Sequence, residues 1–146
     1  MSIDHKTLEQ LKAAYRRWDE SKGKDIQNWA PIFGDEVDFR SLSDGRGGVE
    51  FTRRRLNRDG VMSYLQDLTK SWEMIYFLVE EYICDRDRVV ALGHTSWRNR
   101  ATKRVVETPK CDIWRFKAGK AIEFFEFYDS VQLELATIGG PASIQT

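Results

Sequence analysis

The chain has 146 residues, of which 41% are hydrophobic and 12% aromatic, enough to bury one core in a domain of common size. Its 23 basic and 23 acidic side chains give a formal charge of zero, so no overall field favours nucleic acid or an anionic membrane surface. No apolar run approaches the ~20 residues that span a bilayer, and residues 1–10 lack a signal-peptide core, so we expect no membrane contact and a cytoplasmic location.

The first half of the chain shows helical periodicity broken by turns. Residues 4–20 predict an amphipathic helix, because apolar side chains recur at three- and four-residue steps. Asp25 is typical of a cap for a short second helix that ends near Pro31. Strands are predicted over 36–42 and 49–56, the second at a sheet edge. A third helix begins at Asn57 or Asp59, with this apolar stripe: Val61, Tyr64, Leu65, Leu68 and Trp72.

From residue 74 onward the period of the apolar pattern changes to two. Long strands are predicted over 74–84, 88–99, 105–116 and 121–133. Helices followed by an antiparallel meander indicate an α+β fold with the helices on one face of a curved sheet. We expect one domain over 1–138 and a loose tail over 139–146.

An aromatic segment ends in a carboxylate at Asp129. Because alternate residues of a strand share a face, Phe125, Phe127 and Asp129 are expected to point together. A carboxylate beside two phenyl rings is desolvated, which raises its pKa toward the range for acid/base catalysis at neutral pH. The alternative is that Asp129 is a turn or cap residue at the end of the strand.

A second candidate carboxylate, Asp112, shares a strand face with Trp114 and Phe116. Burying it requires either protonation or a charged partner, and a cross-strand ion pair with an arginine is the alternative to a functional role. His94 lies in the middle of a predicted strand and either shares a proton with a pocket aspartate or is a solvent-edge histidine.

Aromatic and apolar side chains on the helices either line a ligand pocket or form plain core. Tyr15 is on an apolar stripe, and its buried hydroxyl needs a hydrogen-bond partner. The candidate substrate-binding residues are Trp18, Tyr64, Leu68, Trp72, Trp114, Phe125 and Phe127.

Motifs for cofactors and metals are missing from the sequence. There is no phosphate-binding loop, dinucleotide fingerprint or zinc signature. The two cysteines, Cys84 and Cys111, have neither a disulfide nor a metal-site pattern. The arginines of residues 53–58 are expected to form a solvated edge. We therefore expect chemistry without cofactor or metal.

Two segments, residues 13–39 and 111–130, resemble the SnoaL-like polyketide cyclase and ketosteroid isomerase branch of the nuclear transport factor two-like superfamily. The second reads "CDIWRFKAGKAIEFFEFYDS", with an Asp-aliphatic-x-Arg-Phe strand, a Gly-Lys hairpin and an aromatic strand ending in Tyr-Asp. The resemblance implies a cone-shaped sheet over three helices and a homodimer that forms through the outer sheet face.

The resemblance also implies roles for single residues. Tyr15 and Asp112 match the two donors that bind the developing oxyanion in ketosteroid isomerases, the second being a carboxylic acid that an apolar site keeps protonated. Ser41 falls at the position of the general base, where a serine cannot abstract a carbon-bound proton unaided. Asp129 matches an acid/base aspartate of SnoaL-type cyclases and of limonene epoxide hydrolase relatives.

Together these observations predict an acid/base enzyme for a small apolar substrate, aromatic or polycyclic, that carries a carbonyl or hydroxyl group. Asp129 is expected to move the proton, and Tyr15 and Asp112, with His94, to bind the oxygen. Cyclisation, isomerisation and dehydration or lyase chemistry remain open. The alternatives are a non-catalytic binding or dimeric interaction domain, with ion-paired aspartates and a filled cone, and an epoxide hydrolase that uses aspartates and Lys110.

Overall fold

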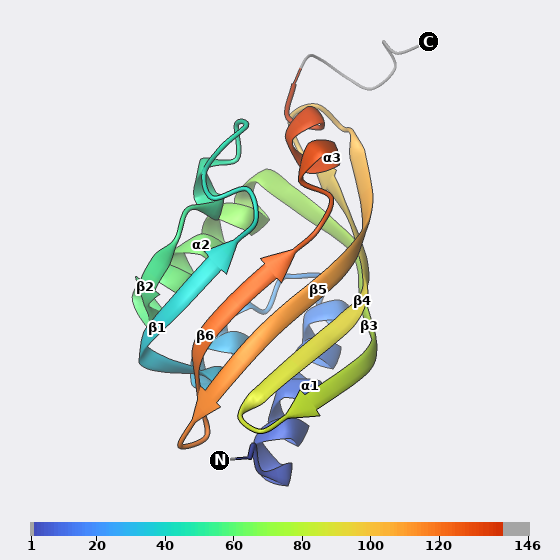
Figure 1. Ribbon diagram of the computed structural model, residues 1–146. Coiled ribbons are helices and arrows are strands. Elements are labelled where there is room, and N and C mark those ends of the chain that lie inside the picture. Colours follow the sequence, from blue (N-terminus) through green and yellow to red (C-terminus); the bar gives the residue numbers. More distant parts are fainter. Residues whose placement is uncertain (1, 139–146) are drawn as a thin grey trace.

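A curved six-stranded sheet with helices against its inner face forms the structure, a computed structural model that describes residues 2–138 (Figure 1). The α+β architecture predicted from the sequence is confirmed. The helices are α1 (His5–Glu20), η1 (Ile26–Ile32), η2 (Glu50–Thr52), α2 (Arg58–Ser71) and α3 (Ser130–Leu135). The strands are β1 (Phe33–Ser41), β2 (Arg55–Asn57), β3 (Trp72–Asp85), β4 (Arg88–Asn99), β5 (Val105–Lys117) and β6 (Lys120–Phe127).

Side-chain caps start both long helices. The Thr7 amide donates to the Asp4 carboxylate at the start of α1 over 2.7 Å, and the Gly60 amide donates to Asn57 at the start of α2 over 2.7 Å. The short second helix is a 3₁₀ helix that contains Pro31, and the Asp25 side chain makes no capping bond there. Only the main-chain carbonyl of Asp25 contributes, accepting from the Asn28 amide.

The strand order is β2-β1-β6-β5-β4-β3, and only β1 and β6 run parallel among these neighbours. The order brings the first strand beside the last, so residues far apart in sequence become cross-strand partners. Glu126 of β6 lies opposite Asp112 of β5 on one side and opposite Ser41 of β1 on the other. This register gathers polar groups from three strands at one level of the inner face.

Two predicted strands are shorter than expected. In the segment 49–56, residues 50–52 form η2 and only Arg55 and Leu56 belong to β2. The predicted strand 121–133 ends at Phe127, and α3 begins at Ser130. The other long strands match the prediction within a few residues.

The inner face of the sheet is the aromatic one. Phe39, Trp114 and Phe124 are buried there and pack edge to face or stacked, with ring centroids 4.6 Å apart for Phe39–Phe124 and for Trp114–Phe124. Within residues 2–138, no helix has the length and apolar character to cross a membrane. The predicted tail, 139–146, lies outside the described residues.

Candidate functional site

A cavity lies between the inner face of the sheet and the helices, with an empty volume of about 860 Å³ that includes open solvent at its mouth. Its wall is mainly aromatic and includes all five tryptophans of the chain: Trp18, Trp29, Trp72, Trp97 and Trp114. Tyr64 and Leu68 of α2 also line it, as the sequence predicted. Half-buried wall residues at η2, α2 and α3, among them Phe51, Leu68 and Leu133, indicate that the cavity opens at that end of the cone.

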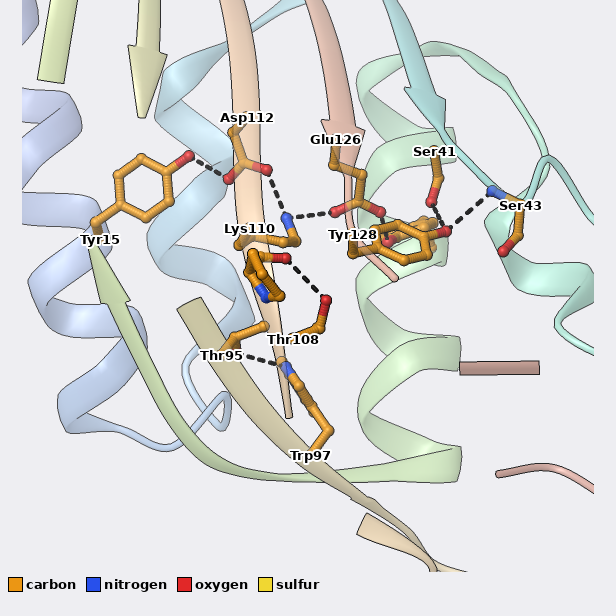
Figure 2. A network of polar contacts seen from close by, with 12 residues as sticks. Tyr15, Ser41, Ser43, Thr95, Trp97, Thr108, Lys110, Asp112, Glu126 and Tyr128 are labelled. Atoms are coloured by element: carbon orange, nitrogen blue, oxygen red, sulfur yellow. Dashed lines mark hydrogen bonds and ion pairs between the residues drawn. The ribbon is translucent and has the colours of Figure 1, made fainter. Parts of the chain in front are cut away.

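Three charged side chains lie in this apolar wall, one ammonium and two carboxylates (Figure 2). The Lys110 ammonium donates to Asp112 Oδ1 over 2.5 Å and to Glu126 Oε1 over 2.9 Å. Asp112 is 3% exposed and Glu126 6% exposed. The strand register explains the contact, because Lys110 and Asp112 are two residues apart on β5 and Glu126 is opposite on β6.

Each carboxylate also accepts a hydrogen bond from a tyrosine on a helix. Tyr15 of α1 donates to Asp112 Oδ2 over 2.5 Å and itself accepts from the Trp114 indole over 2.8 Å. Tyr64 of α2 donates to Glu126 Oε2. Both helices therefore hold the charged group from the side opposite the sheet. All four carboxylate oxygens have a donor.

The pKa values of these groups are shifted by burial and by one another. Burial raises the pKa of Asp112, and the neighbouring Lys110 ammonium only partly opposes this. Burial alone would lower the pKa of Lys110, but the two carboxylates outweigh it and raise that pKa, so the ammonium stays charged. Burial, and then the adjacent carboxylates, raise the pKa values of Tyr15 and Tyr64 well above the usual range.

A second polar cluster adjoins Glu126 on its other side. The Ser41 hydroxyl lies 2.5 Å from the Tyr128 hydroxyl, which also accepts from the Ser43 amide over 3.1 Å. Tyr128 lines the cavity, and Ser41 is the cross-strand neighbour of Glu126. The position where the resemblance places a general base thus lies directly beside a carboxylate from another strand.

Asp129 is not in the cavity, which corrects the expectation that it is a desolvated acid. It is the N-cap of α3, where its carboxylate accepts from the Gln132 amide over 3.1 Å and from the Gln132 side chain over 2.9 Å. These bonds lower its pKa, the opposite of the predicted shift. The alternative interpretation as a cap residue is the one that the structure supports.

Phe125 and Phe127 share a strand face, as predicted, but this is the outer face, which corrects the expectation that they bind substrate. The inward set of β6 is Phe124 and Glu126, whereas Phe125 and Phe127 stack on each other on the outer face with centroids 4.3 Å apart. Neither lines the cavity.

His94 likewise lies on the outer face. Its Nδ1 is 3.2 Å from the Tyr76 hydroxyl and its Nε2 is 3.4 Å from the Glu80 carboxylate. Its hydrogen-bond partners are therefore Tyr76 and Glu80, not Asp112 or Asp129. This placement fits the solvent-edge alternative.

The structure brings together five residues named in the sequence analysis, Tyr15, Tyr64, Lys110, Asp112 and Trp114, and adds Glu126, which the sequence analysis did not select. The sequence feature that could have identified Glu126 is its position two residues after Phe124, because residues two apart on a strand lie on the same face. Among residues 2–138 there is no group of three or more histidine, cysteine, aspartate or glutamate side chains that could hold a metal ion.

The family pattern of the SnoaL-like domain matches residues 11–124, and the chain belongs to this family. An NTF2-like protein of unknown function from Burkholderia pseudomallei has a similar structure, with 15% identity, a TM-score of 0.77 and coverage of 91% of this chain and 98% of that one. No curated protein matches the chain.

Two further structures of similar fold were determined with bound compounds. TerC, co-crystallised with polyporic acid, has 18% identity and a TM-score of 0.72, with 89% of this chain and 96% of that one covered. A protein with a ketosteroid isomerase-like fold from Catenulispora acidiphila, in complex with trimethylamine, has 12% identity and a TM-score of 0.72, with 94% and 98% covered. At these identities the likeness shows the fold alone.

Proposed function

We propose that the chain is a cofactor-independent acid/base enzyme for a small apolar substrate, aromatic or polycyclic, that carries a carbonyl or hydroxyl group. The observation that carries this proposal is the pair of buried carboxylates bridged by one ammonium in an aromatic cavity. A purely apolar binding pocket does not need such a group, because buried charges are costly unless they are paired.

Asp112 and Glu126 have different roles in this proposal. Burial raises the pKa of Asp112, so this carboxyl group can take up a proton and donate it to a substrate oxygen. Glu126 is then the base that removes a carbon-bound proton. It stands beside Ser41, so the carboxylate missing at that position of β1 is supplied by β6.

Tyr15 and Lys110 stabilise the charge that develops. The Tyr15 hydroxyl, oriented by the Trp114 indole, is bonded to Asp112, and the Lys110 ammonium holds both carboxylates. Donors fixed in this way before reaction are usually the largest electrostatic contribution to catalysis. Cyclisation, double-bond isomerisation and dehydration all use this set of groups, and the bound polyporic acid of TerC is consistent with an aromatic, oxygen-bearing ligand.

The test is proton abstraction itself, measured without knowledge of the final product. A panel of keto- and hydroxy-aromatic compounds is incubated with the protein in deuterium oxide, and loss of α-proton signals is followed by NMR. We expect exchange with the wild type and a loss of about 10²- to 10⁴-fold with Glu126→Gln, the usual contribution of a general base.

Asp129→Asn is the matched control, because it removes a carboxylate that lies outside the cavity. If exchange is retained in Glu126→Gln but lost in Asp129→Asn, Glu126 is not the general base. The base would then be Asp129, as the sequence analysis expected. Absence of exchange from every compound would favour the non-catalytic binding domain. That alternative predicts an ion-paired Asp112, as observed, but also a filled cone, whereas the cone contains a cavity.

Epoxide hydrolysis is a second candidate, because Glu126 supplies the second carboxylate that this reaction needs. Glu126 would activate a water molecule, and Asp112 would protonate the epoxide oxygen as the ring opens, with Lys110 between them. Adding aromatic epoxides to the same panel decides between the two, since diol formation marks hydrolysis.

We also propose a homodimer that forms through the outer sheet face. Apolar side chains are exposed on this face: Leu78 at 44% and Ile83 at 46% on β3, and the stacked pair Phe125 and Phe127 lies on the same face of β6. The free thiols of Cys84 and Cys111 support a cytoplasmic location for this dimer.

A further inference from the structure

The charges in the cavity do not balance. Among the described residues that line it, Lys110 carries the one positive charge, and Asp112 and Glu126 carry two negative charges when both are ionised. At Asp112 the hydrogen bonds from Lys110 and Tyr15 favour ionisation. Burial opposes it, since an excess charge in an aromatic environment is poorly solvated.

The other titratable groups around the carboxylates do not correct the imbalance. Tyr15 and Tyr64 donate to them, and Tyr82 of β3 and Tyr128 of β6 lie near them; all four phenols have raised pKa values and stay neutral. The surrounding cations lie outside the cavity wall. Lys12 and Arg16 of α1 lie near Tyr82, and Arg55 lies 6.0 Å from the Tyr64 ring, where it bonds backbone carbonyls and Asp67.

The cavity wall already holds one ammonium group, that of Lys110, against aromatic rings, which is the kind of contact that a ligand cation would make. The Lys110 nitrogen lies 5.3 Å from the centroid of the Phe77 ring and 5.9 Å from that of Phe124, within the range of cation–π attraction. All five tryptophans also line this cavity. Aromatic walls with an excess negative charge are the surroundings that stabilise a quaternary or protonated amine.

We propose that this cavity selects ligands that carry a positively charged nitrogen over neutral ligands of the same shape. The inference rests on the proposed function in that it names the substrate class of the same cavity: an apolar, oxygen-bearing molecule with an ammonium group. The ligand cation and a proton compensate the same excess charge, so they compete. Binding of the cation then releases a proton wherever the carboxylate pair holds one.

The test compares benzyltrimethylammonium with neopentylbenzene, its neutral isostere. Because the tryptophans line the cavity, intrinsic fluorescence reports binding of either probe. We expect the cation to bind about tenfold more tightly at pH 8. The ratio of the two affinities should shrink as the pH falls and the carboxylate pair takes up a proton. This pH dependence can be measured on the wild-type protein alone. Titration calorimetry in buffers of different ionisation enthalpy should show that binding of the cation releases a proton at the lower pH values.

Glu126→Gln removes the excess charge and should abolish the preference. The matched control is Glu107→Gln, which neutralises a carboxylate on the outer face of β5 that is bonded to Tyr76. This variant should keep the wild-type ratio of affinities.

Equal affinities of the two probes at pH 8, or tighter binding of the neutral one, would overturn the inference. If that occurs while proton exchange on ketones persists, the acid/base proposal stands alone. Binding of neither probe, together with absence of exchange, overturns both.

Discussion

The positive charge of Lys110 determines whether two carboxylates can remain in an aromatic cavity. Its side chain is 10% exposed and bonds both Asp112 and Glu126, which are themselves almost fully buried. Removing one member of a buried ionic group costs more than the group contributes, because the remaining charge is left uncompensated.

We therefore expect Lys110→Met to lower the free energy of unfolding by about 3–5 kcal/mol at pH 7.5. The loss should be smaller at pH 4.5. Burial already raises the pKa of Asp112, and without the ammonium its folded-state pKa rises further above its unfolded value. Carboxyl groups with raised folded-state pKa values contribute stability at low pH and lose it as the pH rises through those values. Urea unfolding at the two pH values measures the difference.

Lys12→Met is the control for this experiment. Lys12 is an exposed lysine that pairs with Glu9 one turn away on α1, and exposed pairs of this kind contribute little. We expect a change within about 0.5 kcal/mol. A Lys110→Met variant with the same stability as the wild type at pH 7.5 would show that Asp112 and Glu126 do not depend on the ammonium.

Prediction from the sequence succeeded at the residue scale where a strand was long and regular. The common face of Lys110, Asp112, Trp114 and Phe116 on β5 is confirmed, because alternation holds through an uninterrupted strand. It failed for Asp129, because β6 ends two residues earlier and the local hydrogen bonds of a helix cap take its carboxylate.

At the scale of elements, the pairing of β3 with β4 depends on a glycine. At Gly93 a Cβ atom would lie 1.8 Å from the Leu78 carbonyl oxygen and 2.8 Å from its carbon, on the partner strand. The register of β3 also shifts next to this point, between Val79 and Glu81. The irregularity brings the two backbones together and leaves no room for a side chain.

Gly93→Ala should therefore destabilise the fold by about 1–3 kcal/mol, the usual cost of overpacking that forces the backbone to move. Gly34→Ala in β1 is the matched control. The nearest atoms to an added Cβ at Gly34 are 3.4–3.7 Å away, so that substitution should change stability little. Thermal unfolding of the two variants, measured side by side, gives the comparison, and equal midpoints would contradict the steric argument.

The elements themselves were mostly visible in the sequence, since helical and strand periodicities are local properties. The exceptions are short or terminal: β2, η2 and α3. In these segments few residues repeat a pattern, and contacts with neighbouring elements decide the conformation.

At the scale of the molecule, the proposed dimer uses the outer sheet face, where Leu78 and Ile83 are exposed. We expect the protein to sediment as a dimer, and Leu78→Lys on β3 to shift it toward monomer, because the added charge would be buried at the interface. Leu56→Lys is the control, at a residue that is 63% exposed on β2 at the opposite edge of the sheet. A wild type that is monomeric at all concentrations, or a dimer unaffected by Leu78→Lys, would exclude this face.

The sequence by itself determined the order of the elements, the α+β class and the inward set of β5, because these follow from local periodicity. Only the tertiary structure decided the site. Glu126 becomes the partner of Lys110 and the neighbour of Ser41 through the placement of β6 between β1 and β5, and Tyr15 and Tyr64 reach the carboxylates from two separate helices. Contacts between residues this far apart in the chain depend on strand register and helix packing, which no local pattern encodes.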